Sequence, residues 1–210
     1  MALDKFKNSV AEALQTTVQT EKLSDHALIE AAKNGDEDAF AEIINRYRSQ
    51  ITNYLYRFLN DYEEAIDLAQ ETFVRVYFAI ERYHTDYAFS TYIYRIATNL
   101  AISEIRRRKR RKLVSLTGLF QFDNAEAQDF EPPDEKTLPL ENLIEDEQRE
   151  TIARAIATLP EKYRAPIVLR DVEGKSYEDV AAILKLGLGT TKSRISRARK
   201  LLRDKLQNHF

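Results

Sequence analysis

The cations of the C-terminal segment have the residue types and spacing of a nucleic-acid contact. Guanidinium and ammonium groups donate charge-assisted hydrogen bonds to phosphates, and arginine can bind the edge of a base through two of them. A thin apolar stripe of Ile195, Leu201 and Leu202 runs among these cations. The pattern is typical of a helix in the DNA major groove, although a solvated basic helix of a bundle looks similar. The polar residues concerned are Lys192, Ser193, Arg194, Arg197, Arg199, Lys200, Arg203 and Lys205.

A second group combines aromatic rings with cations in the middle of the chain: Tyr92, Tyr94, Arg95 and Asn99. Rings stack on unpaired bases while cations follow the backbone, so the group suits single-stranded DNA. Core packing is the alternative, which we expect for Ile93 and Ile96 and not for Tyr94. The unbroken basic run that follows, residues 106–112, either contacts phosphates or only keeps the protein soluble.

A third group is acidic and lies on one face of a segment whose other face is apolar. Asp67, Gln70 and Glu71 lie opposite Phe73 and Val76 at helical spacing. Such a face suits a basic partner surface. Spacing alone favours the alternative, an ordinary solvated acidic face, because such faces are common.

Catalytic chemistry is not indicated by the sequence. His26, His84 and His209 are far apart, the carboxylates lack metal-ligand spacing, and no glycine-rich phosphate loop follows a strand. The chain has no cysteine, which excludes a thiolate zinc site and a cysteine nucleophile. We therefore expect no enzyme activity, no cofactor or metal and no small-molecule substrate.

Helices must position these groups, because the composition is poor in glycine, lacks tryptophan and is rich in helix-forming residues. We expect an all-α protein with two helical domains. Apolar residues at helical spacing predict one long helix over residues 39–58, capped by Asp36. The same spacing predicts a second helix over residues 66–80, with Tyr77 on its apolar face, and a third over residues 93–105.

The C-terminal half is expected to form a helix-turn-helix. Ile144, Ile152, Ile156 and Leu159 predict one helix, and Pro166 predicts a kink or a late start in the next. Ser176 can cap a short helix, and Thr190 begins a second. Gly187 and Gly189 would allow the tight turn between them, and the residues of the short helix expected to face inward are Val180, Ala181 and Leu184.

Charge divides the chain, although its net charge is only −2. Residues 123–150 are strongly acidic and contain Pro132, Pro133 and Pro139, which predicts a linker. The expected domains are a tail at 1–23, a bundle at 24–112, an acidic linker at 113–143 and a helix-turn-helix domain at 144–210. Neither a secretory signal nor a run of about 20 apolar residues is visible, so we expect a cytoplasmic protein.

Four segments resemble, in order, those of the extracytoplasmic-function sigma factors of bacterial RNA polymerase. Residues 65–77 read AIDLAQETFVRVY and resemble the family's polymerase-binding motif. Residues 89–111 read FSTYIYRIATNLAISEIRRRKRR and resemble its promoter-melting segment. Residues 159–181 read LPEKYRAPIVLRDVEGKSYEDVA, and residues 176–206 contain the helix-turn-helix of its region four. The resemblance spans almost everything from Leu23 to Leu206.

The resemblance implies a protein without enzyme activity that carries RNA polymerase to promoters and helps to open them. It implies three partners: the polymerase core through its clamp helices and flap, promoter DNA, and an anti-sigma protein. The implied core-binding residues are Asp67, Gln70, Glu71 and Phe73. The implied minus-ten residues are Phe89, Ser90, Thr91, Tyr92, Tyr94, Arg95, Asn99, Arg106, Arg107 and Arg108. The implied minus-thirty-five residues, within or near a helix-turn-helix at about 177–196, are Arg170, Tyr177, Thr190, Lys192, Ser193, Arg194 and Arg197.

Three positions depart from the family's habit. Tyr92 stands where tryptophan is usual, so its ring offers less stacking area and a different polar edge. Thr191 replaces a common valine, and Ser196 is smaller than is usual, so the promoter sequence does not transfer. The competing function is a conventional helix-turn-helix repressor, which explains the C-terminal domain but not a separate aromatic and basic helix.

Overall fold

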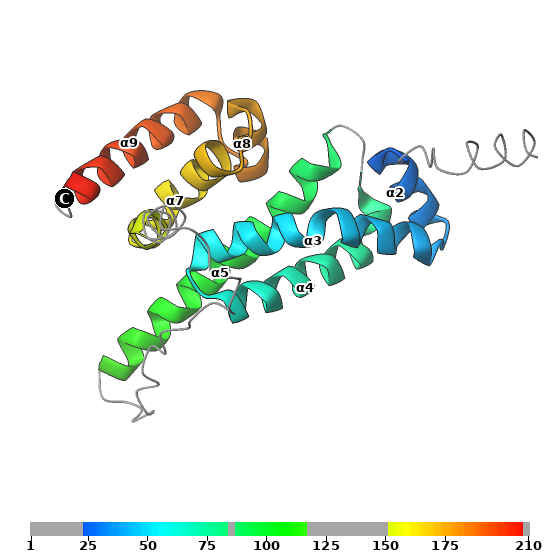
Figure 1. Cartoon of the computed structure of the whole chain (residues 1–210), viewed down its shortest axis with the longest axis horizontal. Coiled ribbons are helices and arrows are strands. Elements are labelled where there is room, and N and C mark those ends of the chain that lie inside the picture. Colours follow the sequence, from blue (N-terminus) through cyan, green and yellow to red (C-terminus); the bar gives the residue numbers. More distant parts are fainter. Residues whose placement is uncertain (1–22, 84–86, 117–150, 208–210) are drawn as a thin grey trace, which may run out of the picture. The chain divides into compact units, whose positions relative to one another are not determined.

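The computed structural model describes residues 23–83, 87–116 and 151–207, and every described element is helical or a turn (Figure 1). This agrees with the all-α expectation. The tail to residue 22, most of the expected linker with its three prolines, Ile144, His84 and His209 lie outside the described residues. By its internal contacts the chain forms two compact units, Met1–Asn45 and Arg46–Phe210. The domain boundaries expected from the sequence stay a prediction.

The first unit contains α2 (Asp25–Lys33) and the start of α3 (Glu37–Leu59). Ser24 caps α2, because its side chain accepts a hydrogen bond from the Ala27 amide at 3.2 Å. Asp36 caps α3 as expected, and its carboxylate accepts from the Ala39 amide at 3.0 Å.

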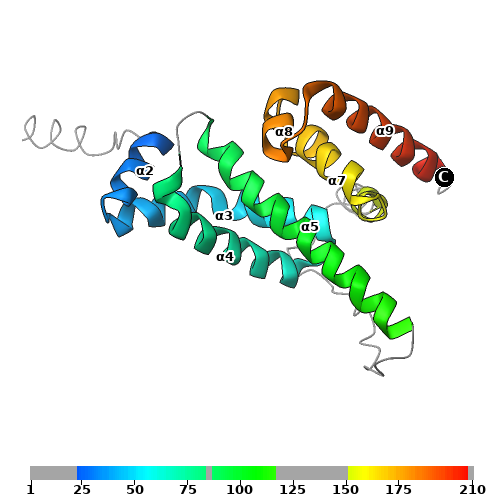
Figure 2. The ribbon, with the colours of Figure 1, turned by 180° about the vertical axis from the view of Figure 1, so that it is seen from behind.

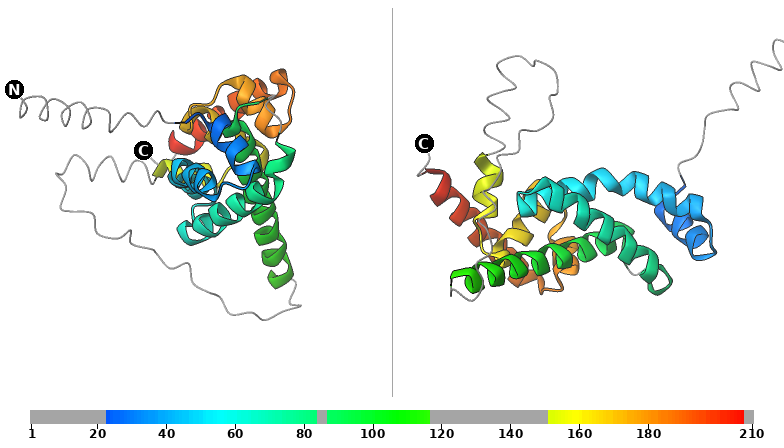
Figure 3. Two further views of the ribbon diagram at one scale, coloured as in Figure 1. Left: turned by 90° about the vertical axis from the view of Figure 1, so that its right-hand side faces the viewer. Right: turned by 90° about the horizontal axis from the view of Figure 1, so that it is seen from below.

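The second unit continues α3 and adds α4 (Tyr62–Ala79), the 3-10 turn η1 (Ile80–Arg82) and α5 (Phe89–Leu116). Helix α5 runs alongside α4 (Figure 3). Helix α4 buries Ala65, Ala69, Thr72, Phe73 and Val76. Tyr77 was expected on this apolar face, but it lies just outside the stripe and is 50% exposed.

Aromatic rings fill the space between α3 and α5. Tyr54, Phe58 and Tyr94 are buried, and the ring centroids of Tyr54 and Tyr94 lie 5.1 Å apart in an edge arrangement. The Tyr54 hydroxyl is 2.7 Å from the Thr98 hydroxyl, so its polar end is satisfied inside the core. Because α3 supplies two of these rings, it fixes the rotation of α5 about its own axis.

The C-terminal helices are α7 (Glu161–Ile167), the π-helical turn η2 (Val168–Val172), α8 (Tyr177–Leu184) and α9 (Leu188–Gln207). A helical stretch at 151–157 precedes them, and α9 packs along α7 (Figure 2). Pro166 lies inside α7, and the regular helix gives way to the π turn just after it. This agrees with the expected interruption, since proline removes a backbone donor from the ladder. Ile152, expected on an apolar face, is 45% exposed.

The turn of the helix-turn-helix is built differently from expectation. Ser176 and Asp179 form a capping box at the start of α8, as the serine predicted. The left-handed residue that ends α8 is Lys185, with φ 52°, and neither Gly187 nor Gly189 has a positive φ. Helix α9 begins at Leu188, two residues before the expected Thr190. Val180 is buried as expected, Ile183 is buried beside it, and Ala181 and Leu184 are half-buried.

Candidate nucleic-acid interface

One face of α9 presents polar side chains in a continuous stripe. Thr190 and Arg197 each lie three or four residues from both Ser193 and Arg194, and all four are exposed except the half-buried Arg194. The opposite face buries Thr191, Ile195 and Ala198. Thr191 can occupy this buried position because its hydroxyl donates a hydrogen bond to the Gly187 carbonyl at 3.1 Å. The stripe is free to enter a groove while the helix remains anchored from behind.

Tyr177 joins α8, α9 and η2 beside this stripe. The Arg170 guanidinium lies 4.6 Å from the centroid of the Tyr177 ring, and the Lys192 ammonium lies 5.8 Å from it. Arg170 also donates to the Lys175 carbonyl at 2.7 Å, which holds its side chain in place. The sequence did not place these three residues together, and the structure makes them one cationic and aromatic cluster.

Not every cation of α9 is equally available. Arg199 donates two hydrogen bonds to Asp171 at 2.6 and 2.8 Å, and this hydrogen bonding raises the pKa of Arg199. Its charge therefore ties α9 to η2, whereas Arg194 and Arg197 have no ion pair within the described residues.

The exposed face of α5 contains only part of the expected minus-ten set. Tyr92, Arg95, Asn99 and Arg106 follow one another along this face and are exposed or half-buried. Ser103, which sequence reasoning missed, is exposed between Asn99 and Arg106 and fits the same helical spacing. We call these five residues the α5 face: Tyr92, Arg95, Asn99, Ser103 and Arg106. Ser90 is half-buried near the start of the helix.

Two expected minus-ten residues are buried at the start of α5. Phe89 and Thr91 are each 3% exposed. Phe89 packs edge-on against Tyr47 and Tyr83, with centroids 5.3 and 5.8 Å apart. In this arrangement both side chains are buried and hold the start of the helix in place.

Tyr92 and Tyr94 differ sharply in their surroundings. Tyr92 is half-buried, lies 5.2 Å from Tyr83 between ring centroids, and donates to the Ala79 carbonyl at 3.3 Å. Tyr94 is only 1% exposed, contrary to the expectation that it would not be a packing residue. Its hydroxyl donates to Glu173 at 2.7 Å, and burial raises the pKa of Tyr94. Of these two rings, only that of Tyr92 has surface open to a base.

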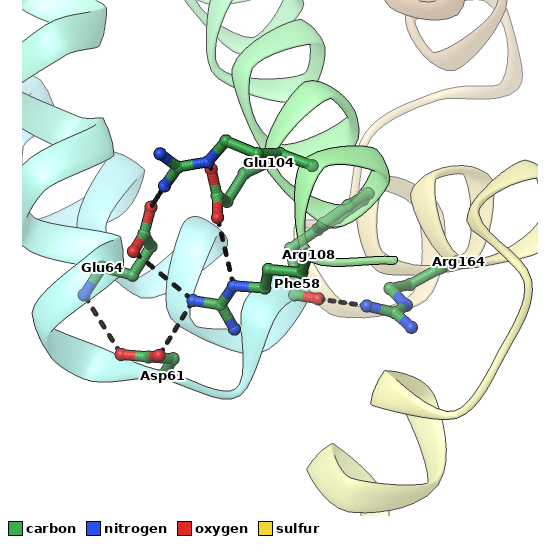
Figure 4. Close-up of polar contacts among 7 residues, drawn as sticks. Phe58, Asp61, Glu64, Glu104, Arg108 and Arg164 are labelled. Carbon is green, nitrogen blue, oxygen red and sulfur yellow. Dashed lines mark hydrogen bonds and ion pairs between the residues drawn. The ribbon is translucent and has the colours of Figure 1, made fainter. Parts of the chain in front are cut away.

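The basic run at the end of α5 separates into cations that form ion pairs and cations that do not, and Figure 4 shows the ion pairs of Arg108. Arg107 pairs with Glu104 and Glu64, and Arg108 pairs with Asp61, Glu64 and Glu104. Within the described residues Lys109, Arg110 and Arg111 are exposed without an ion pair. The charge available to phosphates therefore lies further along the helix than the expected Arg107 and Arg108.

The expected polymerase-binding face lies on α4. Asp67 and Gln70 are exposed, while Glu71 is half-buried and pairs with Arg75 at 2.7 Å. Phe73 is only 7% exposed, so it packs mainly into the core and supports the helix from behind. The same stripe continues into three exposed residues that sequence reasoning did not include, Val74, Tyr77 and Phe78, of which Phe78 is 79% exposed. The three- and four-residue spacing that starts at Asp67 would have placed these residues on the same helix face from the sequence alone.

Among the residues described, no helix has the length and apolar composition needed to cross a membrane. Within the same residues no cluster of histidine, cysteine or acidic side chains has the arrangement of a metal site.

Family models match both ends of the described chain. The model for Sigma-70 region 2 matches residues 43–111, and the model for Sigma-70, region 4 matches residues 149–202. The ECF RNA polymerase sigma factor SigW of Bacillus subtilis is 37% identical over 185 residues, covering 86% of this chain and 95% of the relative. The RNA polymerase sigma-H factor of Pseudomonas aeruginosa is 37% identical over 188 residues, covering 87% and 94%.

Solved structures have a similar fold. The structure of CnrH in complex with the cytosolic domain of CnrY aligns with a TM-score of 0.62 at 22% identity, covering 88% of this chain and 97% of that one. The sigma factor RpoE of Bartonella quintana, in complex with the anti-sigma factor NepR, aligns with a TM-score of 0.59 at 24% identity, covering 80% and 96%.

Proposed function

Because the chain belongs to the extracytoplasmic-function sigma factors of bacterial RNA polymerase, we propose that its exposed helix faces divide the work of promoter recognition. The chain is a transcription initiation factor. We set the repressor alternative aside because the N-terminal half of the chain matches the model for Sigma-70 region 2, which a repressor would not explain. In this division, α4 binds the polymerase core, α5 binds opened promoter DNA, and α8 and α9 bind duplex DNA.

The stripe of α9 and the Tyr177 cluster recognise duplex DNA. Arg194 and Arg197 are long enough to reach base edges of the minus-thirty-five element, and Thr190 and Ser193 beside them offer hydroxyls. Arg170, Tyr177 and Lys192 flank the stripe, where they contact phosphates and fix the register of the helix on the duplex.

The α5 face binds the opened DNA of the minus-ten element. Breaking base stacking costs a few kcal/mol for each extruded base, so an open promoter persists only if protein contacts replace that stacking. The Tyr92 ring supplies stacking, Asn99 and Ser103 supply hydrogen bonds, and Arg95 and Arg106 supply charge. Lys109, Arg110 and Arg111 hold the adjoining phosphates.

The exposed stripe of α4 that begins at Asp67 binds the polymerase core. Asp67, Gln70 and Glu71 suit a basic and polar helical hairpin of the clamp, and Val74, Tyr77 and Phe78 extend this surface with apolar area. A large exposed ring such as Phe78 is typical of a binding anchor, since its burial contributes strongly to association.

A second polymerase contact, with the flap, falls to the groove between α7 and α9. Ile167, Leu202 and Leu206 line this groove, and Asp171, Arg199 and Arg203 form its polar edge. An apolar floor with a charged rim suits an amphipathic partner helix.

The remaining proposals concern partners, chemistry and location. CnrH is solved in complex with the cytosolic domain of CnrY, and RpoE of Bartonella quintana is solved in complex with the anti-sigma factor NepR; we infer an anti-sigma protein for this chain also. We further propose that the chain performs no chemistry of its own and acts in the cytoplasm, where it meets the polymerase.

One observation supports the division of labour most strongly: an aromatic and cationic face on α5 and a cationic stripe on α9 belong to one chain. Run-off transcription with core polymerase on a genomic promoter library tests it. We expect defined start sites that require the chain, together with permanganate-reactive thymines near minus ten. Duplex binding without any polymerase-dependent opening would contradict the proposal.

A further inference from the structure

Helix α9 is held from behind by few large apolar side chains. Its buried residues are Thr191, Ile195 and Ala198, and Ile195 alone among these three has a large apolar side chain. Leu202, further along the helix, is only half-buried. Apolar burial is non-directional, and the small side chains of Thr191 and Ala198 interlock little with their neighbours. Burial therefore keeps α9 on its domain but fixes the rotation of the helix about its own axis only loosely.

An ion pair between η2 and α9 supplies the missing direction. The Nε and Nη2 atoms of Arg199 donate to the two carboxylate oxygens of Asp171 at 2.8 and 2.6 Å. Two parallel hydrogen bonds between planar groups fix an angle as well as a distance. Both side chains stay partly exposed, 47% for Arg199 and 32% for Asp171, so the pair contributes little to the stability of the fold. Its main effect is therefore geometric.

The π turn η2 contacts both helices of the helix-turn-helix. Asp171 contacts α9, and its neighbour Arg170 lies 4.6 Å from the centroid of the Tyr177 ring at the start of α8. Arg170 is itself held, because it donates to the Lys175 carbonyl at 2.7 Å. Adjacent residues of one turn thus fix α8 and α9 relative to each other.

Arg199 lies on the side of α9 away from the stripe that includes Arg194 and Arg197. It follows Lys192 by seven residues, which is about two helical turns, so these two cations lie on one line along the helix. Hydrogen bonding to Asp171 raises the pKa of Arg199, and the nearby Tyr177 side chain raises it further. Arg197, two residues before Arg199, points about 200° round the helix from it. The anchored cation and the stripe therefore occupy different sides of α9.

We propose that Asp171 and Arg199 are a positioning pair, which sets the rotation of α9 so that Arg194 and Arg197 meet the base edges of the duplex. The inference rests on the proposed role of the α9 stripe in duplex recognition. Atoms at the surface of a helix lie about 5 to 6 Å from its axis, so a rotation of about 10° moves them by about 1 Å. Base contacts need a placement within about 0.5 Å. A rotated α9 would lose these contacts while it kept its sequence-independent attraction to phosphates.

The experiment breaks the pair in two ways that affect charge differently. Asp171→Asn removes a negative charge, which by itself favours binding to any duplex. Arg199→Lys keeps the charge but loses the planar group that makes two bonds. Asp204→Asn is the matched control, because Asp204 is an exposed carboxylate on α9 and its change of charge is the same as that of Asp171→Asn.

The measurement is the selectivity of the full chain bound to core polymerase. Selectivity is the ratio of affinities for two duplexes: one enriched by wild type from a library randomised at the minus-thirty-five element, and one of unrelated sequence. We expect Asp171→Asn and Arg199→Lys each to lower this ratio about tenfold. Neither variant should weaken binding to the unrelated duplex, and Asp204→Asn should keep the wild-type ratio. Circular dichroism and thermal unfolding establish that every variant is folded at the temperature of the assay.

A double variant separates positioning from an independent effect. Arg197→Ala removes a side chain that Asp171→Asn only displaces, so the two losses of selectivity should overlap. The double variant should therefore lose clearly less selectivity than the product of the two single fold-changes. A role in stability alone would leave the selectivity of folded molecules unchanged.

Either of two results would overturn the positioning pair. One is an unchanged ratio in Asp171→Asn, including equally tighter binding to both duplexes, which would mean that Asp171 only withholds a cation from DNA. The other is a double variant whose loss equals the product of the single losses. Failure of the proposed function looks different, because Arg194→Ala and Arg197→Ala would then leave the ratio unchanged, whatever Asp171→Asn does.

Discussion

Arg108 of α5 and Asp61, the N-cap of α4, form an ion pair with 2.8 Å between Nη2 and Oδ2 (Figure 4). The same arginine reaches Glu64 and Glu104 at 3.6 and 3.3 Å. A residue of the basic run thus fastens the end of one helix to the start of another. Its role differs from that of its neighbours Lys109 and Arg110, which face solvent.

The first prediction separates these roles. Arg108→Ala should lower the free energy of unfolding by about 1 to 2 kcal/mol, because it leaves three carboxylates with fewer donors. Arg110→Ala should leave that free energy within about 0.5 kcal/mol and should instead reduce the salt dependence of promoter binding. Urea unfolding and binding across a salt series measure the two effects. Equal stability of the two variants would contradict a structural role for Arg108.

The second prediction concerns acid. Burial by itself would raise the pKa of Glu104, but hydrogen bonds and charge from Arg107 and Arg108 lower it below its usual 4.5. A group with a lowered pKa in the folded state stabilises above its unfolded pKa and loses that stabilisation as the pH falls through the lowered value. Wild type should therefore lose more stability than Glu104→Gln as the pH falls below about 4.5. Unfolding curves at several pH values measure this, with Glu63→Gln, an exposed position, as control.

The third prediction concerns the polymerase. Asp67→Lys with Glu71→Lys should weaken binding to the core by tenfold or more, about 1.4 kcal/mol, while circular dichroism shows unchanged helicity. Both side chains lie outside the buried face of α4, so the fold does not depend on them. Phe78→Ser should act in the same direction, and Glu63→Lys in the first turn should have little effect. Unchanged core affinity in the double reversal would assign this face to solvent.

The fourth prediction concerns duplex reading. Arg194→Ala or Arg197→Ala should each cost about 1 to 3 kcal/mol of binding on the preferred minus-thirty-five sequence and relax selectivity there. Lys205, near the end of α9, should contribute less and without regard to sequence. Competition binding on matched and mismatched duplexes measures the difference. A uniform loss for all three substitutions on every duplex would make the stripe a phosphate contact only.

The fifth prediction concerns promoter opening. Tyr92→Ala and Asn99→Ala should reduce permanganate reactivity at minus ten, while recruitment of polymerase through α9 is largely retained. A pre-melted template should partly rescue both variants, because it removes the cost of unstacking. Thr91→Ser, at a buried position, serves as a control that leaves the α5 face intact. Full melting by the Tyr92 and Asn99 variants would remove α5 from the opening step.

Helical spacing and capping residues were sufficient to predict the principal helices. Asp36 and Ser176 cap helices as their positions indicated, and the apolar stripes locate the buried faces of α3 and α5. Local rules succeed here because capping bonds join residues three apart. The left-handed turn at Lys185 escaped these rules, since glycine is the usual residue there and two glycines stood nearby.

The family, and with it the function, could be read from four ordered segments of the sequence alone, and the region 2 and region 4 matches confirm it. Which side chains of those segments remain available to a partner was decided only by tertiary structure. Tyr94 is buried by Tyr54 and Glu173, and Arg107 and Arg108 are neutralised by Glu64 and Glu104. Periodicity gives the face of a helix on which a residue lies, but exposure depends on what packs there from elsewhere in the chain. Glu173 lies 79 residues from Tyr94, and no local pattern contains a contact of that separation.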